Sequence, residues 1–110
     1  MTVSIKDLVP TKMLELANTT QYTCNARAAI IDKITVFNIS DTVACTLDVV
    51  INKSTEPIAA PGLLMQRQFQ PLESYTCPEI SGHGMVPGDR IVTGTTSSNL
   101  VMRITGREIT

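Results

Sequence analysis

The residues of this chain best suited to chemistry are one histidine and three cysteines. His83 lies between Gly82 and Gly84, and Cys77 precedes it by six residues. A cysteine and a histidine can supply half of a zinc site, but the second Cys or His pair that such a site needs is missing from the sequence. We therefore expect His83 in an exposed loop, and we predict neither a metal nor a cofactor.

Nucleophilic catalysis by a cysteine and a histidine is a second possibility. It requires the fold to bring Cys24 or Cys45 beside His83. Cys45 lies on the apolar side of the run at 43–51, where a cysteine behaves as a small hydrophobic residue. A small hydrolase stays open as an alternative, but we expect no enzyme. The odd number of cysteines argues against a disulfide framework, although Cys24 and Cys77 both follow Tyr-Thr and could pair outside a cell.

Paired carboxylates and phosphate-binding loops are weaker candidates. Glu73 and Glu79 flank one predicted strand, and Asp41 and Asp48 flank another, so either pair could meet across a sheet. Solvated surface charge explains them equally well. The stretch 81–84 contains two glycines but is followed by neither Lys-Ser/Thr nor a helical pattern, so it does not form a phosphate cradle.

The elements that would position these residues are predicted to be strands. The run at 43–51 alternates with a period of two, which buries one face of a strand and leaves Asp48 on the wet side. Its inward set is Val43, Cys45, Leu47, Val49 and Ile51. Further strands are expected at 12–16, 21–24, 28–38, 63–69, 72–76, 90–94 and 100–109, separated by turn signals such as Pro87-Gly88-Asp89.

About seven or eight short strands with frequent turns predict an all-β fold, an antiparallel β-sandwich of the Ig-like or jelly-roll-like kind. Residues 11–110 would form this domain, and residues 1–10 an N-terminal arm that ends at Pro10. The turn signal that begins at Asn38 joins the strand at 28–38 to the run at 43–51, which predicts a hairpin.

Apolar residues on both faces of the strand at 28–38 carry the prediction about assembly. Ile30, Ile34 and Val36 share one face, while Ile31 and Phe37 lie opposite. A strand of this kind is covered on both sides, and we expect a neighbouring subunit to supply the second cover. On the last strand Val101, Arg103 and Arg107 point outward, and the arginines could pair with acids on a partner. The candidate subunit interface is therefore Ile31, Phe37, Val101, Arg103 and Arg107.

Composition limits the remaining classes of function. The 110 residues suffice for one domain, and the nine Lys/Arg and ten Asp/Glu are scattered without the basic patch of a nucleic-acid binder. No segment approaches the ~20 apolar residues of a membrane span, and the first residues lack a secretory signal, so we expect a soluble protein made in a cytoplasm. The charged fraction of 17% is low and favours buried subunit contacts. Four methionines could line such contacts or fill the core, namely Met13, Met65, Met85 and Met102.

The order of segments from Tyr22 to the C-terminus resembles small β-sandwich virion structural proteins of tailed bacteriophages. The matching features are a Tyr-Thr segment before a strand that ends in Asn-x-Ser, then an alternating strand, a Pro-Gly-Asp turn and a Gly-Glu-like ending. In this chain they are Tyr22-Thr23-Cys24, Asn38-Ile39-Ser40, the run at 43–51, Pro87-Gly88-Asp89 and Gly106-Arg107-Glu108. The chain departs from the group at Cys24-Asn25 and in the stretch 78–84.

The resemblance implies a non-enzymatic structural subunit, present in many copies at the neck or collar, the tail or the decorated capsid surface of a virion made in a bacterial cytoplasm. Its partners would be other virion proteins and further copies of the chain. A carbohydrate- or receptor-binding module on the same fold is the alternative. It needs an exposed aromatic platform, for which the sequence offers Tyr22, Phe37, Phe69 and Tyr75.

Overall fold

The computed structural model of the chain describes residues 2–52, 63–78 and 80–110. This part of the chain is all-β and its strands pair antiparallel, which confirms the predicted fold class. The strands in chain order are β1 (Val3–Met13), β2 (Thr19–Thr23), β3 (Ala28–Asn38), β4 (Cys45–Asn52), β5 (Leu63–Phe69), β6 (Ser74–Tyr75), β7 (Gly84–Met85), β8 (Arg90–Thr95) and β9 (Leu100–Ile109). No helix able to span a membrane occurs among the residues that the structure describes.

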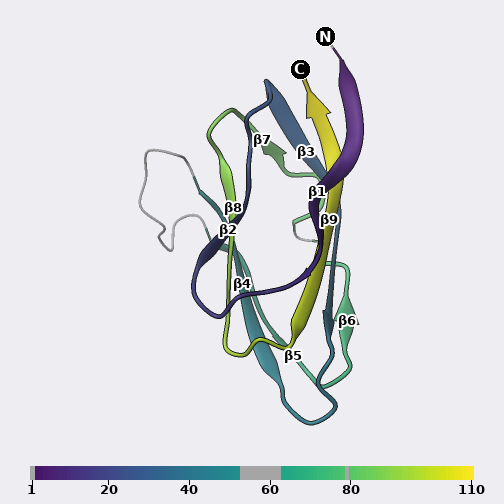
Figure 1. Cartoon of the computed structure of the whole chain (residues 1–110), viewed down its shortest axis with the longest axis vertical. Coiled ribbons are helices and arrows are strands. Elements are labelled where there is room, and N and C mark those ends of the chain that lie inside the picture. Colours follow the sequence, from purple (N-terminus) through teal and green to yellow (C-terminus); the bar gives the residue numbers. More distant parts are fainter. Residues whose placement is uncertain (1, 53–62, 79) are drawn as a thin grey trace.

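Two sheets pack face to face as a sandwich (Figure 1). Sheet A has the order β1-β9-β3-β6, with β7 pairing beside β6 on the same edge of β3, and sheet B has the order β2-β8-β4-β5. The chain passes repeatedly from one sheet to the other, and its two ends lie side by side at one end of the long axis (Figure 1). The expected hairpin is wrong, because β3 belongs to sheet A and β4 to sheet B, so the segment between them crosses the sandwich.

The alternation that defines β4 places its inward side chains in the core. Cys45, Leu47 and Val49 are buried, and Asp48 lies half-buried on the outer side of sheet B, as predicted. Val43 was expected to begin the inward set, but it precedes β4 and is 45% exposed. The inward pattern therefore begins at Cys45, and the residues before it belong to the connection between the sheets.

A β-bulge in β3 explains the apolar residues that seemed to lie on both faces. Ile31 pairs with Gly106 and Lys33 with Thr105, so Asp32 is an additional residue in β3. Ile31, before the bulge, and Ile34, after it, consequently point to the same side, and both are completely buried. Ile31 is therefore a core residue and not an interface residue.

The expected N-terminal arm is part of sheet A. From Val3 onward the chain forms β1, which pairs with β9 along its length, and the expected boundary at Pro10 falls inside this strand. A proline fits there because β1 is an edge strand, whose outward N–H groups have no ladder partner to lose. A register shift lets the consecutive residues Leu8 and Val9 both enter the core.

All three cysteines are buried, and none of them forms a disulfide bond. Cys45 lies in the core as expected, and the possible pairing of Cys24 with Cys77 is not formed. The Pro87-Gly88-Asp89 turn is confirmed. Gly88 has a φ of 94°, and the Asp89 amide donates to the Val86 carbonyl at 3.0 Å, as in a turn that requires glycine at its third position.

Candidate functional site: the outer face of sheet A

The residues first considered for chemistry do not converge in the part of the chain that the structure describes. His83 is exposed, as predicted, and no group of three or more His, Cys, Asp or Glu side chains is placed to hold a metal there. Burial raises the pKa of the Cys24 thiol, which disfavours the thiolate that a nucleophile requires. Glu73 pairs with Arg67 at 3.0 Å, while Glu79 lies outside the described residues.

Four of the five predicted interface residues do share one surface, the outer face of sheet A. Val101 of β9 pairs with Met13 of β1 on one side and with Phe37 of β3 on the other. Directly paired residues point to the same side of a sheet, so the three side chains form a row across three strands. Phe37 is 36% and Met13 44% exposed. Among the methionines that the structure describes, Met13 is exposed, whereas Met65, Met85 and Met102 fill the core.

This row continues toward the end of the sandwich opposite the termini. Ile39 lies two residues after Phe37, and its amide donates to the Asn99 carbonyl at 2.9 Å, so the pairing of β3 with the β9 side is prolonged. Leu72 reaches the other side of this extension, because its amide donates to the Ser40 carbonyl at 3.0 Å. Ile39 is 45% and Leu72 57% exposed. We call Met13, Phe37, Ile39, Leu72 and Val101 the apolar face.

An open hollow lies beside the row. Its volume is about 280 Å³, and it is lined by Thr11, Thr35, Phe37, Val101, Met102 and Arg103. Phe37 and Val101 thus border both the exposed row and the hollow. A concave apolar spot flanked by protruding side chains is the kind of surface that packs against a complementary protein surface.

The two predicted interface arginines are paired within the chain. Arg103 donates to Asp7 Oδ1 through Nε (3.3 Å) and Nη2 (2.9 Å), which joins β9 to β1. Arg107 forms a fork on the Asp32 carboxylate at 2.9–3.1 Å, which joins β9 to β3. Both pairs are exposed, and such pairs contribute at most about 1 kcal/mol. The sequence predicted acidic partners on another chain, but the strand order brings them from the same sheet.

A buried asparagine holds the end of the apolar face in place. The Asn38 side chain is completely buried, and its Nδ2 donates to the carbonyls of Val43 (2.9 Å), Phe69 (3.3 Å) and Gln70 (3.2 Å). Its Oδ1 accepts from the Ser40 amide at 3.0 Å. Asn38 therefore ties the segment that carries Ile39 to the turn between β5 and β6.

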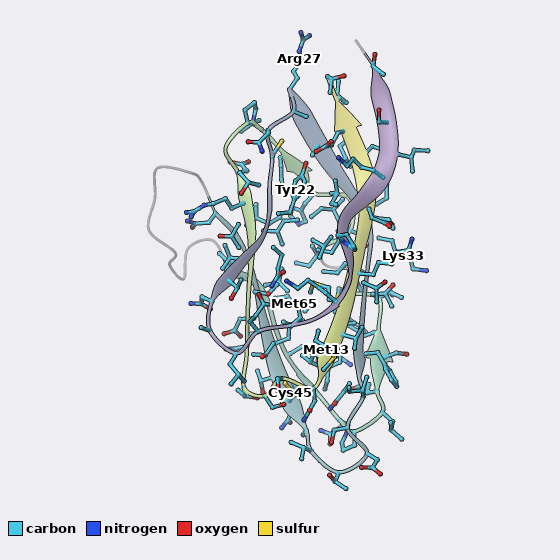
Figure 2. The ribbon with its side chains drawn as sticks, in the orientation of Figure 1. Met13, Tyr22, Arg27, Lys33, Cys45 and Met65 are labelled. Carbon is cyan, nitrogen blue, oxygen red and sulfur yellow. The ribbon has the colours of Figure 1, made fainter. Side chains whose placement is uncertain are left out.

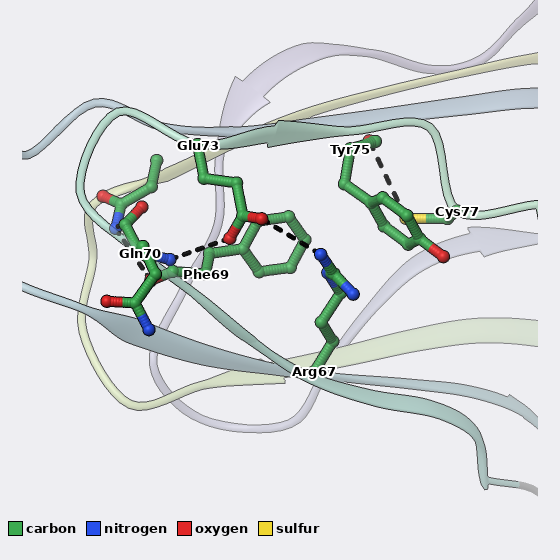
Figure 3. A network of polar contacts seen from close by, with 7 residues as sticks. Arg67, Phe69, Gln70, Glu73, Tyr75 and Cys77 are labelled. Carbon is green, nitrogen blue, oxygen red and sulfur yellow. Dashed lines mark hydrogen bonds and ion pairs between the residues drawn. The ribbon is translucent and has the colours of Figure 1, made fainter.

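The β5–β6 turn that carries Leu72 is fixed by an arginine network (Figure 3). The Arg67 guanidinium lies over the Tyr75 ring, 3.9 Å from its centroid, and donates to Glu73 Oε2 at 3.0 Å. The other Glu73 oxygen accepts from the Gln70 amide at 2.9 Å. Leu72 itself has a φ of 60°, in the left-handed region that non-glycine residues seldom adopt. The network thus holds an exposed leucine in an unfavourable backbone conformation.

A polar lock, formed by Tyr22, Lys6 and Glu108, joins the two sheets at the end of the sandwich that holds the termini. The Tyr22 hydroxyl of sheet B donates to Glu108 of sheet A, and Lys6 Nζ lies 2.9 Å from Glu108 Oε1. Figure 2 shows Tyr22 between the two sheets. The hydrogen bond from Tyr22, followed by that from Lys6, lowers the pKa of Glu108, while burial is the main reason that the pKa of Tyr22 is raised. The carboxylate is therefore stabilised in its charged form.

The aromatic platform of the alternative function is not assembled. Tyr22 is half-buried with its hydroxyl bound to Glu108, Tyr75 is half-buried beside Arg67, and Phe69 is fully buried. Among the described residues, Phe37 is the one exposed aromatic side chain, and it belongs to the apolar face.

A polar hollow lies on the outer face of sheet B, with a volume of about 180 Å³. Asp48 pairs with Gly94 on one side and Gln66 on the other, and its Oδ1 is buried without a hydrogen-bond partner. The absence of a Cβ at Gly94 leaves room for the Asn18 side-chain amide, whose oxygen would collide with a Cβ there. Its lining is Leu16, Asn18, Thr46, Asp48, Gln66, Gly94, Thr95 and Thr96.

Sequence reasoning missed the contribution of Ile39 and Leu72 to the apolar face. Ile39 was assigned to a turn, yet it continues the period-2 pattern of Phe37 and could have been placed on the same side by extending that pattern. Leu72 had no such signal, because its position depends on the crossing of the chain between the sheets. In comparisons with protein-family models, curated proteins and solved structures, nothing matches this chain.

Proposed function

We propose that this chain is a structural subunit of a tailed-phage virion, packing in multiple copies at the neck or collar, the tail or the capsid surface. The observation that carries the proposal is the apolar face. Met13, Phe37, Ile39 and Val101 lie on the outer side of sheet A, and Leu72 lies in the turn at its end. Four of the five side chains are 36–57% exposed. Contiguous apolar surface of this kind marks interaction sites on proteins that are otherwise soluble.

The occupant that we propose for the apolar face is a second copy of the chain. Beside the face, the Arg103–Asp7 and Arg107–Asp32 pairs place charges of both signs next to each other. A copy carrying the same pattern can approach without burying an unpaired charge, which would be costly. The exposed Met13 can adapt its shape to such a partner.

The proposal of a virion protein rests on the sequence resemblance. Two motifs of that resemblance stabilise connections between strands in this fold. The Asn-x-Ser motif supplies Asn38 and Ser40, whose side chains bind the connection between the sheets. The Pro-Gly-Asp motif makes the turn into β8. Both motifs shape connections between strands of the sandwich.

Sedimentation velocity of the unmodified chain and of two variants tests this proposal. We expect an oligomer at micromolar concentration, and we expect Phe37→Ser to weaken association by about 10-fold or more, as for other central aromatic contacts. Val86→Ser is the matched control, because it removes a 60% exposed apolar side chain from the turn before β8, outside the apolar face. Equal association of Phe37→Ser and the unmodified chain would contradict the proposed face.

A carbohydrate-binding module is the second candidate, and the polar hollow on sheet B is the observation that favours it. An unpartnered carboxylate oxygen surrounded by amide and hydroxyl groups suits the hydroxyls of a sugar. Binding to a panel of immobilised glycans, lost in Asp48→Asn and kept in Phe37→Ser, would support this candidate. If no glycan of the panel binds, the carbohydrate-binding function is contradicted.

A further inference from the structure

The outer edge of β1 is the longest exposed strand edge of sheet A. Thr2 and Thr110 exchange both backbone hydrogen bonds, at 3.2 and 2.9 Å. Hydrogen-bonded and non-hydrogen-bonded pairs alternate along an antiparallel ladder. The pairs Ser4–Glu108 and Lys6–Gly106 therefore direct their backbone groups toward each other. It follows that Val3, Ile5 and Asp7 direct their N–H and C=O groups away from β9, toward the open edge.

This open edge is regular over a short segment that is symmetric about Ile5. The pairing of β1 with β9 runs without interruption from Val3 to Asp7, and the first register shift follows Asp7. Beyond it, Pro10 and a second shift protect the rest of β1 from pairing with another strand. Lys6, which could protect the first half, is instead held by Glu108.

The side chains on this segment add to its capacity for pairing. Ile5 is 83% exposed, more than any other large hydrophobic residue of the described chain, and Val3 is 53% exposed. Both point to the same side of sheet A as Met13, because Ile5 pairs with Arg107 and Val3 with Ile109 on the outer face. The edge of β5 differs, since Gln66, Arg67 and Gln68 occupy its middle.

We propose that two copies of the chain pair β1 to β1, antiparallel, about a two-fold axis at Ile5. This inference rests on the proposed function, since it names one contact by which the subunits assemble. Ile5 then faces Ile5 of the partner subunit, and Val3 faces Asp7 of the partner subunit. The three residues with free backbone groups all find partners, which closes about six hydrogen bonds. An axis at Ser4 would close only about four.

Charges and side chains are compatible with this register. On the inner side, Ser4 faces Lys6 of the partner subunit, so no two charges of the same sign are directly opposed. The two Ile5 side chains bury each other on the outer side. The joined sheet carries two apolar faces on the same side, so further copies can pack against it through a second kind of contact. A two-fold contact alone closes at a dimer, whereas two different contacts build a larger assembly.

Two variants at Ile5 test the pairing independently. Ile5→Pro removes an N–H that points away from β9, so the fold keeps its own hydrogen bonds while the edge loses its central donor. We expect unchanged far-UV circular dichroism and at least a 10-fold weaker β1–β1 association in sedimentation velocity. Ile5→Thr keeps the donor and is the matched control, expected to weaken association less.

Ile5→Cys tests the β1–β1 pairing by cross-linking, even if Ile5→Pro fails to fold. Opposed residues in a hydrogen-bonded pair lie about 5.5 Å apart, within reach of a disulfide. With diamide as the oxidant, we expect Ile5→Cys to form covalent dimers. Val3→Cys should not form them alone, because the two positions would lie about 13 Å apart. A mixture of Val3→Cys and Asp7→Cys should form them. The native cysteines are 0–1% exposed and do not compete.

The outcomes separate this inference from the proposed function. An oligomeric chain in which Ile5→Pro changes nothing and Ile5→Cys does not cross-link would overturn the β1 pairing and leave the proposed function standing. Cross-linking of Ser4→Cys in place of Ile5→Cys would overturn the register and hence the proposal as stated. A monomeric chain without cross-links would overturn both.

Discussion

Replacing Asn38 should destabilise the protein more than replacing any exposed asparagine. The side chain makes four hydrogen bonds, three from Nδ2 to carbonyls and one from the Ser40 amide to Oδ1, and it is fully buried. A net contribution of about 1 kcal/mol per bond, with three carbonyls sharing two N–H groups, gives a loss of about 3 kcal/mol for Asn38→Ala. For a chain of this length that loss lowers the melting temperature by about 12 °C.

Urea unfolding followed by far-UV circular dichroism measures this loss, because the chain contains no tryptophan. The experiment is done at one fixed protein concentration, since association adds to apparent stability. Asn38→Asp keeps the acceptor for Ser40 but turns an oxygen toward the three carbonyls, so we expect a cost at least as large. Asn25→Ala, at an exposed position, is the control and should cost less than about 0.5 kcal/mol. A loss below about 1 kcal/mol in Asn38→Ala would refute the structural role given to this residue.

Three further predictions concern the interior and the lock between the sheets. Tyr22 and Lys6 hold the pKa of Glu108 below its ordinary 4.5, so their contribution to stability is fully present above that pH and is lost as the pH falls below it. The difference in unfolding free energy between the unmodified chain and Glu108→Gln should therefore shrink from pH 7 to pH 3. A difference that stays constant over this range would contradict the stabilising role of these contacts. Gly106→Ala would place a Cβ against the Ile30 carbonyl oxygen and 2.7 Å from Leu8 Cδ1, so urea unfolding should show that the unfolding free energy falls by about 2 kcal/mol or more. Gly84→Ala is the control, because the nearest atom to its new Cβ lies at 3.9 Å, and its unfolding free energy should change little. No cysteine of the native protein should react with a thiol reagent and all three should react in denaturant, and rapid labelling of the native protein would contradict their burial.

Local patterns in the sequence predicted the inward side chains correctly where the alternation within a strand is not interrupted by a bulge. The period-2 alternation placed Cys45, Leu47 and Val49 in the core, and glycine chemistry identified the turn at Gly88. Both features depend only on neighbouring residues. The bounds of β3, β5 and β9 also agree with the expected strands, because turn-forming residues flank each of them.

The predictions that were wrong concern features that depend on which strands pair with each other. The bulge at Asp32 shifts the phase of β3, so Ile31 was assigned to an outer face when it belongs to the core. The short connection after Asn38 suggested a hairpin, but it crosses to the other sheet. Neither outcome is encoded in the spacing of residues within the segment, since both are set by the pairing of β3 with β9.

The structure gives the location of each residue of the predicted interface, and the interface itself stays a prediction. Phe37 and Val101 lie on the outer face of sheet A, whereas the bulge turns Ile31, which shared a predicted face with Phe37, into the core. Arg103 and Arg107 flank that face, but Asp7 and Asp32 of the same chain neutralise them. Only the strand order β1-β9-β3 brings these acids beside the arginines.

Size-exclusion chromatography with light scattering on the unmodified chain measures directly whether the chain assembles into an oligomer. A subunit that packs in multiple copies should elute at micromolar concentration with a mass that is a multiple of 11.9 kDa. We expect an even number of copies if β1 pairs with β1 and the apolar face joins such dimers. A single species at 11.9 kDa that persists to high micromolar concentration would contradict it.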